Sequence, residues 1–424
     1  MDTRALEMAG TRALLRNRGF RRLWLAQFST VTVVYGLSLA GAVLVEEQTR
    51  SSTQTGLVIL SAILPAFLGS LVSGAVVDRW GRRRVLLASH LARAGVALAF
   101  WGSTSLLSPS LALVTVYAVN VAAAACTQFA TPSEFAMLPD LVERDRLVSA
   151  NALLQLSMLA AEGLGIVVLS PLVIRLFGVA AMGLISAGLY LLGASLVATL
   201  PQDLSLARPV GSLSSTWKHM WADLQAGWQT IAHDRLLTLV AIQATVAATL
   251  LLVLLSLLPG LMSRYMGLGV EGAPILLLPG GLGFVLSSIL LSRWEKRMSR
   301  PAWIGLGLIG LGMSIGLLGL FSNAPARLWL IVPLVFGIGF ALAPVIVSAR
   351  VVLQERPPAQ KRGRVIAAQL ALANAAAVIP LLLGGSLADT LGIRPVMGLL
   401  GVIALGAGVA GLYYTQSQGR NGET

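Results

Sequence analysis

The chain has 424 residues, of which 56% are hydrophobic and only 12% are charged. A soluble domain usually carries about 25% charged residues, so this composition excludes an ordinary soluble protein and indicates membrane-spanning segments. The formal net charge of +13 would suggest nucleic-acid binding in a soluble protein, but no soluble region of the sequence combines a basic patch with interleaved aromatic residues.

Twelve long apolar segments follow one another along the chain, and each is continuous rather than alternating. Continuous apolar runs of roughly 20 residues predict transmembrane helices and not the strands of a barrel. We therefore expect an all-α membrane protein. Its spans are predicted at 20–45, 54–77, 85–107, 109–131, 147–175, 179–200, 235–262, 273–291, 301–322, 327–349, 365–388 and 395–414.

The basic residues give the orientation of these spans. If the N-terminus is cytoplasmic, 25 of the 31 lysine and arginine residues lie on the cytoplasmic side and five on the outer side. Cytoplasmic loops of membrane proteins carry this excess of positive charge. We therefore expect both termini in the cytoplasm of a bacterial cell, with the chain in the plasma membrane.

A short basic turn separates the second and third spans. It reads Gly74-Ala75-Val76-Val77-Asp78-Arg79-Trp80-Gly81-Arg82-Arg83-Arg84. A carboxylate among arginines and beside a helix N-terminus is stabilised by charge pairing and by the helix dipole. Gly74 would let helices approach closely, and Gly81 would allow the tight turn. A simpler role stays open, in which the arginines only mark the cytoplasmic face or contact anionic lipid.

Two charged residues fall inside spans of the first half. Glu162 lies near the middle of the fifth span, and Arg93 lies roughly 13 Å into the third, because each helical residue rises about 1.5 Å. An acid at this depth must be paired or protonated. Glu162 is therefore the candidate for proton coupling, with a hydrogen bond between helices as the alternative. We also consider an Arg93–Glu162 contact, since both lie at similar depth; otherwise Arg93 anchors its own helix.

The longest connection, 201–234, divides the chain into two halves. Within it Trp217, Trp221, Leu224 and Trp228 recur on one face of a helix, which predicts an amphipathic helix at the cytoplasmic interface. A regulatory or partner-binding linker is the alternative.

The two halves show weak similarity to each other, for example between Asp78-Arg79-Trp80 and Ser292-Arg293-Trp294. Repeated six-helix units are typical of secondary transporters, whose substrate site lies between the repeats. We expect a six-helix bundle at 1–200, a linker at 201–234 and a second, pseudo-symmetric six-helix bundle at 235–424.

Asp389 closes the eleventh span at its outer end, where we expect an outer gate or a helix cap. Polar residues inside the spans are candidates for substrate contact, although each could instead bridge two helices. These residues are Gln27, Tyr35, Asn120, Gln155, Gln243, Gln369 and Asn374. The sequence has no metal-spaced cluster of His and Cys and no nucleotide-binding Gly-x-x-x-x-Gly-Lys-Ser/Thr loop, so it predicts no enzyme, no metal and no cofactor.

The basic turn matches the pattern Gly-x-x-x-Asp-Arg-x-Gly-Arg-Arg, and the chain thereby resembles the major facilitator superfamily, which carries this signature between spans two and three. Segments 20–29, 132–153 and 354–365 resemble the drug:proton antiporter branch that includes macrolide-efflux proteins and the enterobactin exporter. The lysophospholipid transporters share much of the segment between spans four and five.

The resemblance implies two pseudo-symmetric bundles around a central cavity, with transport driven by the proton gradient. Glu162 and Arg93, chosen from their positions within the spans, are the coupling candidates. It also implies that the basic turn is a conformational switch, which holds the halves together while the cavity faces outward. The switch residues would be Gly74, Asp78, Arg79, Gly81, Arg82 and Arg83. The sequence departs from the exporter pattern because the fifth span lacks a Gly-Pro pair and the first span has no central acid, only Tyr35 and Ser38.

The sequence therefore predicts a monomeric secondary transporter that exports apolar or amphipathic small molecules by alternating access, in exchange for protons. A lysophospholipid or other lipid transporter is the main alternative. A non-transporting membrane sensor or scaffold is an alternative from another class, but it would need no titratable group in the middle of a span. The expected partners are a small-molecule or lipid-like substrate and membrane lipids, with no nucleic acid.

Overall fold

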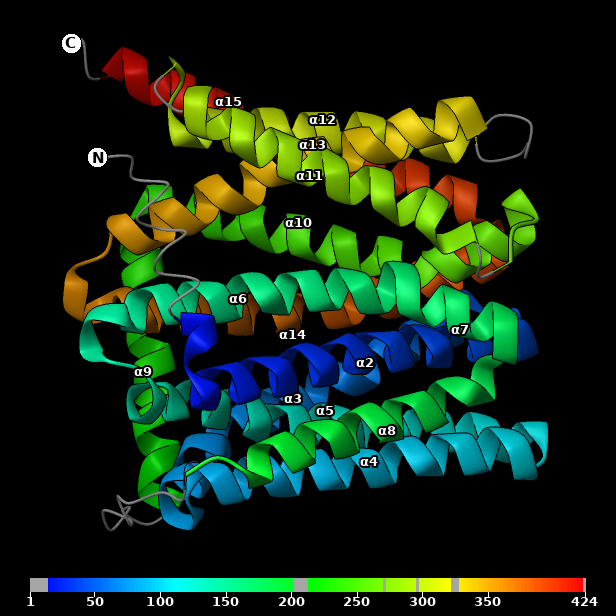
Figure 1. The fold of residues 1–424 in the computed structure, drawn as a ribbon. Helices are drawn as coiled ribbons and strands as arrows, with labels where there is room; N and C mark the ends of the chain where they lie inside the picture. Colours follow the sequence, from blue (N-terminus) through cyan, green and yellow to red (C-terminus); the bar gives the residue numbers. More distant parts are fainter. Residues whose placement is uncertain (1–13, 202–212, 270–271, 295–296, 322–327, 422–424) are drawn as a thin grey trace. The chain divides into compact units, whose positions relative to one another are not determined.

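The computed structural model describes residues 14–201, 213–269, 272–294, 297–321 and 328–421. Throughout these ranges the backbone is helical apart from short connections (Figure 1). The long elements are α2 (Arg18–Thr49), α3 (Ser52–Trp80), α4 (Arg82–Leu106), α5 (Pro109–Leu141), α6 (Leu147–Gly163), the π-helix η2 (Leu164–Leu169), α7 (Ser170–Phe177), α8 (Val179–Ala198), α9 (Leu213–His233), α10 (Arg235–Gly260), the π-helix η3 (Leu261–Met266), α11 (Ala273–Trp294), α12 (Arg300–Phe321), α13 (Leu328–Glu355), α14 (Arg362–Leu391) and α15 (Ile393–Asn421).

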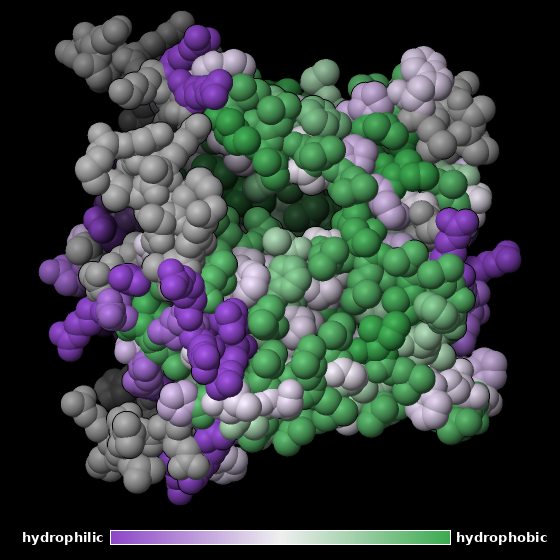
Figure 2. Space-filling model, in the orientation of Figure 1, coloured by the Kyte–Doolittle hydropathy of each residue, from purple (hydrophilic) through white to green (hydrophobic). Residues whose placement is uncertain are grey.

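The membrane character of these helices follows from their length and composition. In the described part of the chain, eleven helical stretches are long and apolar enough to cross a membrane. The second expected span corresponds to α3, whose first part, Ser52–Ile63, is also apolar. On the face seen in Figure 2, hydrophobic side chains cover the middles of the helices and hydrophilic side chains gather at their ends. The all-α membrane fold is therefore confirmed.

The fourth span is longer than the sequence indicated. The helix predicted at 109–131 continues for ten more residues to Leu141. Glu134, Met137 and Leu141 are buried at helical spacing, so the added turns bury a continuous face. The connection expected from Pro132 onward was wrong, because this burial outweighs the hydrogen bond that a proline removes from the helix.

The chain folds into two compact units. Unit 1 consists of Met1–Gln48 and Leu60–Trp217, and unit 2 of Thr49–Ile59 and Lys218–Thr424. In unit 1, α4 packs against α5 and α8; in unit 2, α12 packs against α13 and α15, and α10 against α14 (Figure 1). The short segment Thr49–Ile59 thus belongs with unit 2, although its neighbours in sequence on both sides belong to unit 1.

A hydrophobic cluster fixes the helix ends of unit 1 that are predicted to be cytoplasmic. Phe20 of α2, Leu86 of α4 and Leu138 of α5 are among its fully buried members. Asn17 joins two of these helices, since its Nδ2 donates to the Leu141 carbonyl (2.8 Å) and its Oδ1 accepts from the Phe20 N–H (3.1 Å). The side-chain oxygen thereby caps α2, as Asn does at helix starts.

The amphipathic helix expected in the linker is α9, and it docks on unit 2. Leu224 is buried, and the Trp228 Nε1 donates to the Ala368 carbonyl of α14 (3.0 Å). Asp223 forms an ion pair with Arg364 of α14 (2.8 Å). The Trp217 side chain lies outside the described residues. The predicted apolar face therefore packs in part on another helix, not only on lipid.

Asp234 joins the start of α10 to the end of α13. Its carboxylate accepts hydrogen bonds from the N–H groups of Leu236 (2.9 Å) and Leu237 (3.2 Å) and forms an ion pair with Arg356 (2.7 Å). Burial alone would raise the pKa of Asp234, but the bonds from Arg356 and the two N–H groups lower it below its ordinary value. Asp234 is therefore a helix N-cap with a charged partner.

We expect Asp234→Ala to lower the free energy of unfolding by about 1 kcal/mol, because the first turn of α10 loses its cap. Asp234→Asn should cost less, since asparagine caps equally well and loses only an ion pair that is partly exposed. Because the pKa of Asp234 is lowered in the folded state, its charged form stabilises the fold at neutral pH. This stabilisation is lost as the pH falls below about 4 and the carboxylate takes up a proton. Thermal unfolding of the variants in detergent at pH 7 and pH 4 tests this, and an Asn variant as unstable as the Ala variant would contradict the capping role.

Candidate functional site

The basic turn is built around Gly81, which precedes α4. Its φ angle of 88° is a backbone conformation that favours glycine. Arg82 forms an ion pair with Asp140 at the end of α5 (2.8 Å), and Arg83 donates to the carbonyls of Val197 (3.3 Å) and Ala198 at the end of α8. The turn therefore ties together the ends of α4, α5 and α8 in unit 1.

The remaining switch residues are Gly74, Asp78 and Arg79. Arg79 is exposed at the end of α3. The side chain of Asp78 and the surroundings of Gly74 lie outside the described residues. Their role in a conformational switch stays a prediction.

A second constellation in unit 1 was missed in the sequence. Glu134 of α5 is 3% exposed and Arg93 of α4 is also 3% exposed, and the Arg93 charge acts on the Glu134 carboxyl. The Arg93 guanidinium carbon lies 5.8 Å from the centre of the Tyr190 ring, within the range of a cation–π interaction. Gln27 of α2 lies beside Glu134, but its buried amide atoms reach no partner with full hydrogen-bond geometry. We call Arg93, Glu134, Gln27 and Tyr190 the buried charge cluster.

The buried charge cluster corrects the contact considered between Arg93 and Glu162. The structure forms no ion pair between these two described residues. The Arg93 guanidinium lies over the Tyr190 ring, and its charge acts on Glu134. Glu134 was not predicted as a site residue, because the fourth span was expected to end at residue 131. The helical spacing of Glu134 with Met137 and Leu141 was the signal that could have revealed it.

Glu162 has a different environment from Glu134. It is half-buried in the last turn of α6, directly before the π-helix η2, and its charge acts on Tyr35 of α2. The two side chains were predicted separately, one as a coupling group and one as a cavity residue. The structure places them near each other within unit 1.

The π-helix η2 is in close contact with α2. A Cβ atom added at Gly165 would overlap the Thr32 carbonyl and lie 3.2 Å from the Gly36 nitrogen. A Cβ at Gly36 would in turn lie 3.3 Å from the Gly165 carbonyl. Glycine is needed at both positions because the two backbones touch, and π-helical turns often occur at functional sites.

The other predicted cavity residues differ in their surroundings. Asn120 of α5 accepts from Ser38 Oγ of α2 (3.1 Å) and donates to Ser61 Oγ of α3 (3.0 Å), so it joins three helices. Gln243 is buried in unit 2 and donates to the Ala407 carbonyl (3.1 Å). Both therefore make the interhelical bonds that were considered as the alternative role.

The three remaining predicted cavity residues lie at or near helix surfaces. Gln155 is exposed on α6, while Gln369 and Asn374 are half-buried on α14. Substrate contact by any of the predicted cavity residues stays a prediction.

Asp389, near the end of α14, holds the start of α3. Its carboxylate accepts hydrogen bonds from Ser52 N (2.6 Å), Thr53 N (3.0 Å), Thr53 Oγ1 (2.7 Å) and Ser51 Oγ (2.7 Å). Arg264 lies 3.6 Å from the same carboxylate and donates to Ser52 Oγ (2.6 Å). The cap expected at Asp389 is therefore formed on another helix. We call these five residues, all in unit 2, the Asp389 clasp.

Comparison with known proteins identifies the family. The model of the Major Facilitator Superfamily matches residues 23–379 and 280–423. The multidrug efflux pump Tap of Mycolicibacterium fortuitum is 28% identical over 386 residues, which cover 85% of this chain and 89% of that protein. The enterobactin exporter EntS of Salmonella typhimurium (strain LT2) is 29% identical over 140 residues, or 33% of each chain.

The fold is shared with solved transporters. The crystal structure of a mutant of the peptide transporter POT in complex with sulfate superimposes with a TM-score of 0.73 over 95% of both chains, at 13% identity. At that identity the likeness concerns the fold alone. The multiple apolar helices, the fold and the family model agree in indicating a multi-pass membrane transporter. This chain belongs to the major facilitator superfamily.

Proposed function

We propose that this protein exports apolar or amphipathic small molecules across a bacterial plasma membrane, in exchange for protons and by alternating access. Export is supported by the relatives, because Tap is described as a multidrug efflux pump and EntS as an enterobactin exporter. Proton exchange is supported by Glu134 and Glu162, two of the acids inside the spans of unit 1.

Glu162 carries the proposal of proton coupling. A coupling carboxyl must take up a proton on one side of the membrane and release it on the other, so it needs both a low-polarity setting and access. Glu162 is half-buried and acts on the Tyr35 hydroxyl, and it directly precedes the π-helix that contacts α2. Protonation of Glu162 would therefore change the electrostatic environment of the contact between α2 and η2.

Glu134 is the less suitable coupling group of the two. It is almost fully buried and lies in the field of Arg93, which always keeps its charge. Loss of the Glu134 charge would leave Arg93 without a countercharge. We therefore assign Glu134 to the structure of unit 1 and Glu162 to coupling.

The Asp389 clasp is a second part of the proposed transport cycle. It holds the connection between α2 and α3 to α14 and η3 through hydrogen bonds to one carboxylate. By the charge distribution of the loops, this end of the helices faces outward. We propose that the clasp closes the outer side and opens when substrate is released.

The coupling proposal is tested with Glu162→Gln in proteoliposomes. Substrates are first found by a thermal-shift screen of drugs, siderophores and lysolipids. With one-to-one exchange, a pH gradient of one unit supports about a tenfold substrate gradient, because one pH unit is worth 1.36 kcal/mol per proton. We expect the wild type to build up a substrate gradient of about tenfold under this pH gradient. With Glu162→Gln, the substrate concentration should become equal on the two sides of the membrane.

The matched control is Glu143→Gln, since Glu143 is an exposed acid of the same unit. This variant should keep the wild-type response. If Glu162→Gln accumulates substrate as the wild type does, Glu162 is not the coupling site. If the wild type itself ignores the pH gradient, proton exchange is wrong. Lysolipids as the sole hits of the screen would favour the lipid-transporter alternative.

A further inference from the structure

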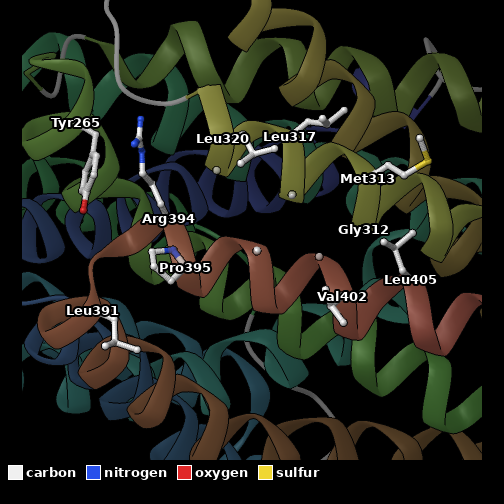
Figure 3. A pocket seen from close by; sticks show the side chains of 14 residues that line it. Tyr265, Gly312, Met313, Leu317, Leu320, Leu391, Arg394, Pro395, Val402 and Leu405 are labelled. Atoms are coloured by element: carbon white, nitrogen blue, oxygen red, sulfur yellow. The ribbon is translucent and has the colours of Figure 1, made fainter.

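A groove runs along unit 2 between α12 and α15. It has a volume of about 780 Å³, and its walls come mainly from residues 312–320 of α12 and 394–405 of α15 (Figure 3). Nearly all of its lining is apolar. Arg394 and Tyr265 lie together near one end of the groove in Figure 3 and supply its polar groups.

The groove opens toward the bilayer. Leu320 on its α12 side is 70% exposed and Val402 on its α15 side is 66% exposed. Large exposed apolar side chains on spanning helices face lipid, so this space is reached from the membrane. The stretch from Arg394 to Leu405 rises about 16 Å, close to the roughly 15 Å thickness of one leaflet of the hydrocarbon core.

Arg394 lies at the start of α15 without a countercharge. No carboxylate in the described part of the chain forms an ion pair with it, and its Nε atom is buried without a hydrogen-bond partner. Arg264, by contrast, is paired with Asp389. The Tyr265 hydroxyl accepts from the Ile393 N–H (3.2 Å), which leaves its own proton to donate. Arginine and a hydroxyl together suit the oxygens of a phosphate.

Several glycines line the groove, at the contact between the two helices and along its open surface. At Gly312 an added Cβ would lie 2.5 Å from the Gly401 carbonyl, so α12 and α15 touch there. At Gly316 and Gly398 an added Cβ would meet nothing within 4 Å. These two positions therefore border open space that the protein itself does not fill.

We propose that this groove binds an anionic phospholipid. The phosphate lies at Arg394 and Tyr265, and one acyl chain lies along the open positions at Gly316 and Gly398. The unpaired cation at the end of the groove attracts the headgroup, and the apolar walls accept the chain. The site lies in the leaflet that the basic-residue distribution identifies as the outer one.

The test is lipid binding by native mass spectrometry of the full-length protein in detergent. Phosphatidylglycerol and phosphatidylcholine with identical acyl chains are titrated, with inorganic phosphate in a separate arm. We expect phosphatidylglycerol to bind at least about tenfold more tightly than phosphatidylcholine. Arg394→Gln should remove this preference, Arg394→Lys should keep most of it, and Gly398→Leu should weaken both lipids by occupying the groove.

Two control variants share the chemistry of the changes but lie elsewhere. Arg175→Gln removes an exposed arginine of unit 1 from the same predicted membrane face. Gly406→Leu adds a side chain on α15 where nothing lies within 4 Å, outside the groove. Both should bind as the wild type does. Equal binding of the two lipids to the wild type, an unchanged preference in Arg394→Gln, or full displacement by inorganic phosphate would overturn the proposal.

Discussion

Glu134→Gln is expected to lower the free energy of unfolding by about 1–3 kcal/mol, because the buried Arg93 guanidinium loses the acid with which its charge interacts. Both side chains are only 3% exposed. Arg93→Met should cost less, since the remaining Glu134 can take up a proton, whereas an arginine cannot give one up. The double variant should recover at least about 1 kcal/mol relative to the sum of the single changes. Reversible unfolding of the four proteins in mixed detergent micelles measures these differences.

The control for this cycle is Asp140→Asn on the same helix. Asp140 also pairs with an arginine, Arg82, but its side chain is 53% exposed. An exposed pair contributes about 0–1 kcal/mol, so this variant should be nearly as stable as the wild type. If the effects of the two single variants on the free energy of unfolding sum to that of the double variant, the Arg93 and Glu134 charges act independently.

Gly165→Leu is the change with the second largest expected effect. Its side chain would be forced into the Thr32 carbonyl of α2, and backbone atoms cannot move aside as a flexible side chain can. Overpacking of this kind costs typically 1–3 kcal/mol, and it would push apart the helices that carry Tyr35 and Glu162. We therefore expect lower thermal stability together with loss of most transport activity.

Gly163→Leu is the matched control for this change. Gly163 lies two residues earlier on the same span, and an added Cβ there meets nothing within 4 Å. A leucine at this position should leave stability unchanged or raise it slightly, since glycine disfavours helices by about 1 kcal/mol. Equal thermal stability and transport of the two leucine variants would show that the contact of η2 with α2 does not limit either property.

The fold could be read from the sequence to a large extent. Apolar runs long enough to cross a bilayer marked the helices, because a chain in lipid must satisfy its backbone hydrogen bonds within each span. The spacing of Trp221, Leu224 and Trp228 likewise predicted α9. The last ten residues of α5, up to Leu141, were not predicted as helix. A proline at residue 132 disfavours a continuing helix locally, and only packing against other helices shows that burial outweighs this cost.

Some features of the candidate site could be predicted from the sequence and others could not. Gly81 could be placed at a turn, since its pattern is local and its positive φ follows from the turn geometry. The partner of Arg93 could not be identified, because depth along a span says nothing about the direction in which a side chain points around the helix. The same ambiguity hid the proximity of Glu162 to Tyr35.

The sequence by itself indicated the membrane solvent, the all-α fold and the superfamily, because hydropathy, loop charge and the basic-turn motif are local properties of the chain. Tertiary structure alone decided which charges meet. The Arg93 charge acts on Glu134, Asp389 caps the distant helix α3, and Arg394 has no ion-pair partner among the described residues beside an open groove. Each depends on how helices rotate and pack against one another, and that packing is set by contacts between residues far apart in the chain.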